Sequence, residues 1–247
     1  MDKKEDVIIY QRYGGLGDNL QFSTLPELYS SFGHDVYIHS DNAVRNEGID
    51  DLVWKKNPFI KGRKNLPVNA GEFPWVQNQH INPLTNTFIE IMEMRHSLPP
   101  TNIYPKIYYT PVLIEDLKDT TLIDFNAVSR LNDRKNKSNI LYGQAADLIE
   151  EKGLKNVKIL EYSNLSNPHE NIWESTPRLK VDDIFHLCDI LYSCQTFICS
   201  HSGNHSLVSA IKAHRETPKV FCYPNHWPVH DSHLHIFPNI EYIQIKS

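Results

Sequence analysis

The sequence lacks the long apolar runs and the short motifs that mark several common classes of protein. In its 247 residues, no apolar run approaches the roughly 20 residues that a membrane-spanning helix needs. The charged N-terminus passes directly into a strand-like run and offers no signal-peptide core. The pattern GxxxxGK[ST] is absent, which excludes a P-loop nucleotide site. DxD is absent as well, so a divalent cation on a nucleotide would lack its usual carboxylate ligands.

Cysteine is scarce and positive charge is not in excess. The four cysteines, at positions 188, 194, 199 and 222, show no CxxC spacing, and we expect buried free thiols of a reducing compartment. This usage favours a cytoplasmic location. With 25 Lys and Arg against 30 Asp and Glu, the formal net charge is −5, which argues against nucleic acid as the partner.

Glycine is also scarce, with 10 residues, yet three of them cluster in "QRYGGLGDNL" (11–20). The apolar run "VIIY" before this loop predicts a buried strand. After it, apolar residues at helical spacing predict an amphipathic helix: Leu25, Leu28, Tyr29 and Phe32. Thr24 and Glu27 have capping-box spacing around Pro26, so this helix is expected to begin near Thr24, or to begin earlier and kink there. Gly33 suits its C-terminus, and "HDVYIHS" (34–40) predicts the next strand of one βαβ unit.

The rest of the chain divides at a proline-rich connector. Residues 57–75 are rich in Pro, Gly and Asn and predict a loop. "WVQNQH" (75–80) predicts a strand, and "NTFIEIMEMRHSL" (86–98) predicts a helix. The next 13 residues hold four prolines and predict an extended linker. Strands and helices then alternate again, which predicts domains at 1–110 and 111–247. This pattern indicates an α/β protein with two Rossmann-like domains that face each other across a cleft, with both glycine-bearing loops at the carboxyl ends of parallel strands.

The glycine loop carries a candidate catalytic residue, Asp18. The spacing of Gly15 and Gly17 does not complete GxGxxG, so dinucleotide binding is not favoured. A carboxylate directly after the glycines would repel a phosphate, which makes Asp18 a candidate general base for a hydroxyl proton. Asp18 could equally cap the following helix. Asn19 and Gln21 accompany it as candidate acceptor-binding positions.

The second candidate loop, "SHSGNHS" (200–206), lies where a predicted strand turns into a helix. Free backbone N–H groups and the helix dipole would make this turn a diphosphate seat. The candidate donor-binding residues here are His201, Ser202, Gly203, Asn204 and His205, where the histidines could add hydrogen bonds or charge. The alternative is an ordinary capped turn.

Two further segments are ambiguous. "RLNDRKNKS" (130–138) holds four cations after a predicted strand; a solvated loop is the default, with phosphate contact through Ser129 and Arg130 as the alternative. Four histidines, His226, His230, His233 and His235, crowd a proline-bearing segment near the C-terminus. No helix fixes a ligand geometry there, so we expect a loop lining the cleft, with Trp227 available for stacking, rather than a metal site.

Taken together, "GGLGDNLQFSTLPEL" and "FICSHSGNHSLVSAI" resemble the two signature regions of the heptosyltransferase-type glycosyltransferases. Gly15, Gly17, Asp18, Leu25 and Pro26 match the first pattern, and Ser202, Gly203 and Leu207 match the second. The resemblance implies a GT-B fold, Asp18 as the base that deprotonates the acceptor hydroxyl, and an inverting mechanism without a metal. It departs from the family at two positions: the family's Asp is His201 here, and its His is Ser206. The family's lysine after the first strand of the second domain has no clear counterpart, although Arg130 or Lys135 could replace it.

These observations predict a compact glycosyltransferase with no cofactor and no metal. Its partners would be a nucleotide-diphosphate sugar and a bacterial surface-glycan acceptor, free or lipid-linked, with peripheral contact with the inner membrane. Two alternatives remain open: a sugar-nucleotide epimerase or hydrolase on the same fold, and a non-catalytic sugar-nucleotide-binding protein.

Overall fold

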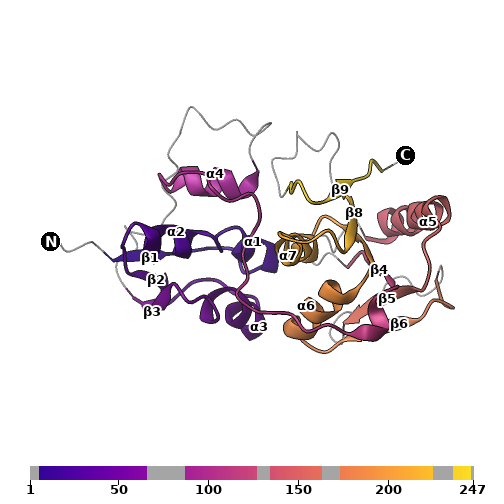
Figure 1. The fold of residues 1–247 in the computed structure, drawn as a ribbon, viewed down its shortest axis with the longest axis horizontal. Coiled ribbons are helices and arrows are strands. Elements are labelled where there is room, and N and C mark those ends of the chain that lie inside the picture. Colours follow the sequence, from indigo (N-terminus) through magenta and orange to yellow (C-terminus); the bar gives the residue numbers. More distant parts are fainter. Residues whose placement is uncertain (1–5, 66–86, 127–133, 163–172, 225–235, 246–247) are drawn as a thin grey trace. The chain divides into compact units, whose positions relative to one another are not determined.

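The chain folds into two compact units, each built around a parallel β-sheet (Figure 1). The computed structural model describes residues 6–65, 87–126, 134–162, 173–224 and 236–245. The first unit comprises Met1–Thr110 with a short C-terminal stretch that includes Phe237, and the second comprises the remainder from Pro111 onward. The protein is therefore α/β with parallel sheets.

The first unit holds a three-stranded parallel sheet in the order β1-β2-β3. Its elements are β1 (Val7–Ile9), α1 (Leu16–Leu20), α2 (Leu25–Ser31), β2 (Val36–His39), α3 (Glu47–Asp50), the π-helical turn η1 (Asp51–Lys55), β3 (Ile60–Lys64) and α4 (Phe88–Arg95). The apolar side chains of β1 and β2 are buried, as the predicted βαβ unit requires. β1 ends before the loop that carries the candidate residues of this unit, and β2 ends before a loop that pairs with it.

The helix after the glycine loop is split into two. α1 begins directly after Gly15, a turn follows at residues 21–24, and α2 begins at Leu25 with Pro26 in its first turn. The predicted capping box at Thr24 is wrong: Thr24 has helical backbone angles and its side chain makes no capping hydrogen bond, while Glu27 pairs instead with Lys106 and Tyr108. The prediction for Gly33 is confirmed, since it adopts φ 81° directly after the helix end.

The second unit holds a six-stranded parallel sheet in the order β6-β5-β4-β7-β8-β9. Its elements are the 3₁₀ turn η3 (Glu115–Leu117), β4 (Thr121–Asp124), α5 (Arg134–Lys152), β5 (Val157–Tyr162), β6 (Arg178–Val181), α6 (Ile184–Ser193), β7 (Thr196–Ser200), α7 (Gly203–Ile211), β8 (Lys219–Tyr223) and β9 (Glu241–Tyr242). If the strands of this sheet are numbered from 1 at β4 in the order of the chain, their order across the sheet is 3-2-1-4-5-6. This is the strand order of a doubly wound Rossmann sheet. The direction of winding reverses between β4 and β7, the topological switch point of the sheet.

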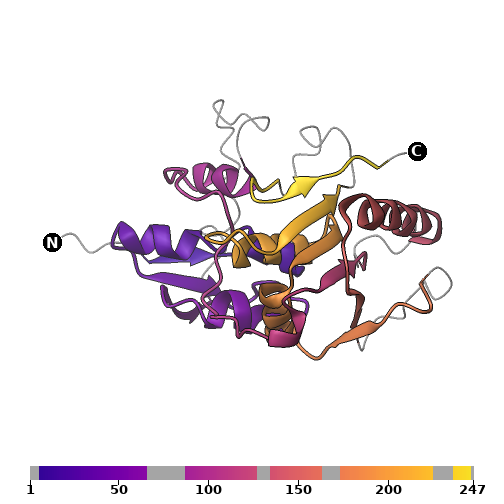
Figure 2. The same ribbon diagram turned by 45° about the vertical axis from the view of Figure 1, so that its right-hand side comes forward.

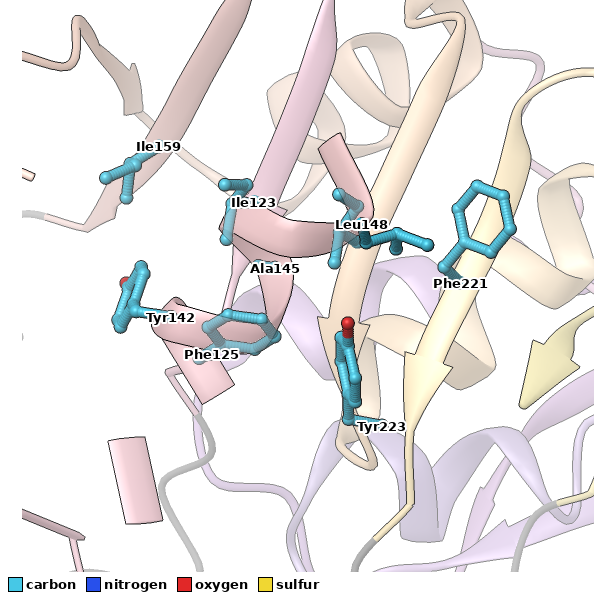
Figure 3. Close-up of a cluster of buried hydrophobic side chains, with 9 residues drawn as sticks. Ile123, Phe125, Tyr142, Ala145, Leu148, Ile159, Phe221 and Tyr223 are labelled. Carbon is cyan, nitrogen blue, oxygen red and sulfur yellow. The ribbon is translucent and has the colours of Figure 1, made fainter. Parts of the chain in front are cut away.

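The core of the second unit forms between α5 and one face of its sheet (Figure 3). Alternate residues along the strands point toward α5. They pack against one aromatic and two aliphatic side chains of this helix. The cluster consists of Ile123, Phe125, Tyr142, Ala145, Leu148, Ile159, Ile198, Phe221 and Tyr223. α5 lies beside the strands in both ribbon views (Figures 1 and 2). This packing fixes the sheet whose carboxyl ends carry the candidate site.

Four segments differ from the sequence-based expectation. Ile60–Lys64 forms β3 rather than a loop, and its alternating half-buried and exposed residues are those of a largely polar strand. α5 begins at Arg134, so residues 134–138 are helical and not a solvated loop. β6 and β9 were not predicted. The predicted strand at 75–80 lies outside the described residues.

The expectation for cysteine is confirmed, because all four thiols are free and buried. Among the helices that the structure describes, none combines the length and the apolar character that a membrane crossing requires.

Candidate functional site

The candidate site of the second unit lies at the topological switch point of its sheet. β4 ends at Asp124 and β7 at Ser200, and Asp124 stands opposite Cys199 in the strand register. α7 begins immediately after, with Ser202 at the N-cap and Gly203 as the first helical residue. In doubly wound sheets, ligands bind outside the carboxyl ends of the strands at this point. The structure thus brings Ser202, Gly203 and Asn204 to the place where such folds hold ligands.

The N-terminus of α7 has unsatisfied hydrogen-bonding groups. Ser202 occupies the N-cap, but its side chain makes no capping hydrogen bond. The hydroxyls of Ser200, Ser202 and Ser206 are buried and have no hydrogen-bond partner among the described residues. A buried hydroxyl without a partner costs about 1–3 kcal/mol, and the first backbone N–H groups of any helix lack intrahelical acceptors. This turn is therefore not an ordinary side-chain-capped helix start, and it has the donors that an anion requires.

A buried network holds Asn204 in place on α7. Asn204 Nδ2 donates to Asp124 Oδ2 at 2.5 Å and to the Tyr162 hydroxyl at 2.8 Å. The Tyr162 hydroxyl donates to Asp124 Oδ2 at 3.2 Å, and Asp124 Oδ1 accepts from the Asn126 backbone N–H at 2.9 Å. Burial raises the pKa of Asp124, and the hydrogen bonds from Asn126, Asn204 and Tyr162 oppose that rise. The network joins the carboxyl ends of β4 and β5 to the first turn of α7.

Asp124 and Tyr162 were not singled out from the sequence. The one available signal was an aspartate that ends a fully buried strand, since such a carboxylate needs hydrogen-bond donors in the fold. Its partners lie 38 and 80 positions away along the chain, and only the strand order shows which residues they are.

The two histidines of this loop are buried and pack against each other. His205 Nδ1 lies 2.8 Å from the Ser202 carbonyl oxygen, and His205 Nε2 lies 3.4 Å from the Tyr242 hydroxyl. A carbonyl oxygen can only accept, so the contact places a proton on Nδ1, while the Tyr242 hydroxyl lies within hydrogen-bond distance of Nε2. The His201 ring meets the His205 ring edge-on at 4.6 Å between centroids. His205 therefore ties the loop to the Ser202 carbonyl and to Tyr242.

In the first unit, Asp18 lies in the first turn of α1 and folds back over Gly15. The Gly15 backbone N–H donates to the carboxylate, an N3 residue bonding to the N-cap as in half of a capping box. A Cβ at position 15 would stand 2.5 Å from Asp18 Oδ2 and 3.8 Å from a guanidinium nitrogen of Arg45. Burial raises the pKa of Asp18, and both the Gly15 hydrogen bond and the Arg45 charge lower it. A half-buried carboxylate of raised basicity is thus fixed at the rim of the loop.

Asn19 holds the glycine loop to the body of the first unit. Its Nδ2 donates to the Gly15 carbonyl at 2.9 Å and to the Tyr13 carbonyl at 3.4 Å, and its Oδ1 accepts from Trp54 Nε1 at 2.8 Å. The side chain is completely buried, so its polar atoms serve the protein itself. Gln21 is buried as well, in the turn between α1 and α2.

The glycine loop also pairs with the loop that follows β2. Arg45 N–H donates to the Gly14 carbonyl at 2.8 Å. A Cβ at position 14 would approach the Arg45 backbone nitrogen to 2.9 Å. These contacts hold Arg45 beside Asp18. Close approach of backbone and side chains is therefore the reason for Gly14 and Gly15.

Several predicted residues lie outside the described part of the chain: Ser129, Arg130, Trp227, His226, His230, His233 and His235. Within the residues that the structure does describe, no group of three or more His, Cys, Asp and Glu side chains is placed to hold a metal ion.

Comparison with solved structures finds the fold of this chain in several sugar-transferring enzymes. TibC of enterotoxigenic E. coli H10407, an iron-containing dodecameric heptosyltransferase solved with ADP-D-beta-D-heptose, superposes with a TM-score of 0.63 at 13% identity, over 98% of this chain and 62% of TibC. A glycosyl transferase family 9 protein of Veillonella parvula DSM 2008 gives 0.62 at 9% identity, over 100% of this chain and 87% of that one. E. coli ADP-heptose lps heptosyltransferase II superposes with a TM-score of 0.56 at 10% identity, over 98% of this chain and 91% of that one.

The present chain thus spans about three fifths of the length of TibC. No model of a known protein family matches it, and a comparison with curated proteins finds no match either. At these identities the likeness concerns the fold, and at that level the resemblance inferred from the two signature regions is confirmed: the chain has the fold of heptosyltransferase-type glycosyltransferases.

Proposed function

We propose that the protein is an inverting, metal-independent glycosyltransferase of GT-B type. In this proposal the second unit binds a nucleotide-diphosphate sugar, the first unit binds the acceptor, and the two face each other across a cleft. The acceptor is a hydroxyl of a bacterial surface glycan, free or lipid-linked. TibC, solved with ADP-D-beta-D-heptose, supports a nucleotide sugar as the donor.

The observation that carries the proposal is the start of α7 at the switch point. The helix is nine residues long, and its uncapped first turn stands next to three buried serine hydroxyls without partners. Ser202 is only half-buried as a residue, and in this proposal its hydroxyl turns toward the bound anion. Backbone N–H groups and hydroxyls that donate to phosphate oxygens would satisfy these groups together.

Asp18 is the proposed base of the first unit. Its carboxylate takes the proton of the acceptor hydroxyl, whose oxygen attacks the anomeric carbon of the donor. The bond between that carbon and the diphosphate oxygen breaks, and the nucleoside diphosphate leaves with the electron pair. The raised pKa of Asp18 makes it a stronger base than an exposed aspartate.

Charge on the leaving diphosphate is stabilised in this proposal by the preset dipoles of α7 instead of by a cation. TibC contains iron, so dependence on a metal needs a direct test. In the described part of this chain no side-chain group fits an iron site, and the mechanism uses none.

A transfer assay tests the proposal. The protein is incubated with ADP-, GDP-, UDP- and CDP-linked hexoses and ADP-heptose, with and without truncated bacterial lipopolysaccharide, and released nucleoside diphosphate and product sugars are followed by mass spectrometry. Release that requires the acceptor, with the sugar joined in inverted configuration, supports the proposal. A new sugar isomer or free sugar without acceptor would indicate an epimerase or a hydrolase, and donor binding without turnover a non-catalytic binding protein.

A further inference from the structure

The side chain of Asn204 contributes a hydrogen-bond acceptor at the start of α7. We infer that Asn204 is a specificity-determining residue whose Oδ1 accepts a hydrogen bond from a hydroxyl of the nucleotide sugar, and that Asp124 is the positioning residue that holds it. This inference rests on the proposed function, because it assigns the ligand of that site.

The network uses both hydrogens of the Asn204 amide nitrogen and leaves the amide oxygen available to accept a hydrogen bond from a ligand. Both hydrogens of Nδ2 have acceptors, one on Asp124 Oδ2 and one on the Tyr162 hydroxyl. Oδ1 accepts no hydrogen bond within the described residues, and it is not among the buried unpartnered atoms, so it retains contact with solvent. The side chain thus presents an acceptor and no donor.

The orientation of the amide is dictated by Asp124. One carboxylate oxygen accepts from the Asn126 backbone N–H, which can only donate. The other accepts from Tyr162 and from Asn204, so an amide turned the other way would set its oxygen against the carboxylate. Asp124 ends the fully buried strand β4, and Tyr162 ends the neighbouring strand β5, so the paired strands hold the Asp124 carboxylate in this orientation.

The position of Asn204 indicates the ligand group that it meets. Asn204 is the second residue of α7, adjacent to Gly203 in the proposed diphosphate seat. On either side of the diphosphate, a nucleotide sugar carries hydroxyls, those of the ribose and those of the transferred sugar. An acceptor fixed beside the diphosphate therefore selects for one of these hydroxyls, and a site that hydrogen-bonds a hydroxyl discriminates against analogues that lack it.

Calorimetric titration tests this assignment. Wild type, Asn204→Leu and Tyr162→Phe are titrated with ADP, GDP, UDP and CDP, with their glucose conjugates and ADP-heptose, and with the 2′-deoxy, 3′-deoxy and 2-deoxyglucose analogues of whichever binds. Leu is nearly isosteric with Asn but lacks the acceptor. Tyr162→Phe is the matched control, because it removes one donor to Asp124 and one acceptor of Asn204 Nδ2 but leaves Asn204 bonded to the Asp124 carboxylate and its Oδ1 unchanged.

We expect Asn204→Leu to bind about 10-fold more weakly and Tyr162→Phe less than about threefold more weakly. Wild type should reject one deoxy analogue by about 10-fold, and Asn204→Leu should bind that analogue and its parent alike. If Asn204→Leu already loses affinity for the free nucleoside diphosphate, the hydroxyl that Asn204 meets belongs to the ribose. If it loses affinity only for the sugar conjugate, that hydroxyl belongs to the transferred sugar. A merely structural role would not change the discrimination between parent and analogue.

The inference is overturned if the affinity of Asn204→Leu for the nucleotide ligand is within twofold of wild type. It is also overturned if Tyr162→Phe loses as much affinity as Asn204→Leu does. Should Asn204→Leu fail to fold, the wild-type comparison decides, since equal binding of every deoxy analogue contradicts the assignment. Wild type that binds no member of the panel would overturn the proposed function itself, an outcome distinct from these.

Discussion

The carboxylate of Asp18 lies against Gly15 so closely that a Cβ at position 15 would stand 2.5 Å from Asp18 Oδ2. The backbone of Gly15 is in an ordinary extended conformation, with φ −71°, so conformational freedom is not what this position requires. It requires the absence of a side chain. The glycine allows Asp18 to bond to the Gly15 N–H and fixes the carboxylate that we propose as the base.

Replacing Gly15 by alanine should displace Asp18 without unfolding the protein. The added methyl group meets the end of a side chain, which can move, so we expect kcat to fall at least about 10-fold while the free energy of unfolding falls by no more than about 1–2 kcal/mol. Transfer kinetics and urea unfolding measure the two quantities.

Gly143→Ala is the matched control for Gly15→Ala. It lies in α5, a Cβ there meets nothing within 4 Å, and the substitution should stabilise the helix by about 0.5–1 kcal/mol with unchanged transfer. If Gly15→Ala keeps wild-type kcat, the position of Asp18 against Gly15 is irrelevant to the reaction.

Asp18→Asn should retain the fold and donor binding but lose about two to four orders of magnitude in turnover. The acid limb of the kcat/KM profile in wild type should lie above 3.8, the ordinary pKa of aspartate, because burial raises the pKa of Asp18. A raised folded pKa also means that the stability contribution of this group is full below pH 3.8 and is lost as pH rises through the folded value. The unfolding free energy of wild type relative to Asp18→Asn should therefore decline from pH 3 to pH 7. Turnover within a few-fold of wild type would make Asp18 only a helix cap.

Acid should destabilise the first unit through His96. Its Nδ1 lies 3.0 Å from the Tyr29 hydroxyl, its Nε2 is buried without a partner, and burial lowers the pKa of His96 from 6.5 to about 4. A lowered folded pKa gives stability that is present above pH 6.5 and lost as pH falls toward 4. Between pH 7.5 and 4.5, wild type should lose about 2–3 kcal/mol relative to His96→Phe in urea unfolding. Parallel pH dependences of the two proteins would contradict this.

Transfer should persist in excess chelator. The dipole and hydroxyl donors at the start of α7 are proposed to carry the charge of the leaving group. Turnover is measured after dialysis against EDTA, with manganese, magnesium or iron added back. Activity that disappears in EDTA and returns with a metal would overturn the metal-free mechanism and direct attention to His226, His230, His233 and His235.

Local patterns predicted the elements whose apolar residues are regularly spaced, and missed those that are mostly polar. α7 follows from Leu207 and Ile211, and β7 from a run in which every residue is buried. β3 was missed because its sequence, IKGRK, has no apolar alternation, and its pairing with β2 is a tertiary effect. Thr24 fails as a cap because the chain enters it already in helical conformation from the turn after α1.

The candidate site could be located from the sequence but its internal partners could not. The positions of Asp18 and Asn204 follow from the turns that hold them. By contrast, the Trp54 partner of Asn19 and the Asp124 and Tyr162 partners of Asn204 lie 35 to 80 positions away. Such pairs depend on strand order, which sequence periodicity does not determine.

Calorimetric titration of Gly203→Val with the nucleoside diphosphate that wild type binds tests directly whether the start of α7 holds the donor diphosphate. Gly203 is the first residue of α7, and a branched side chain there should obstruct the approach of an anion to the backbone N–H groups. We predict that Gly203→Val unfolds at the same temperature as wild type and binds the nucleoside diphosphate at least about 10-fold more weakly. Gly143→Ala should bind it as wild type does. Wild-type affinity in folded Gly203→Val would contradict the assignment of this turn as the diphosphate seat.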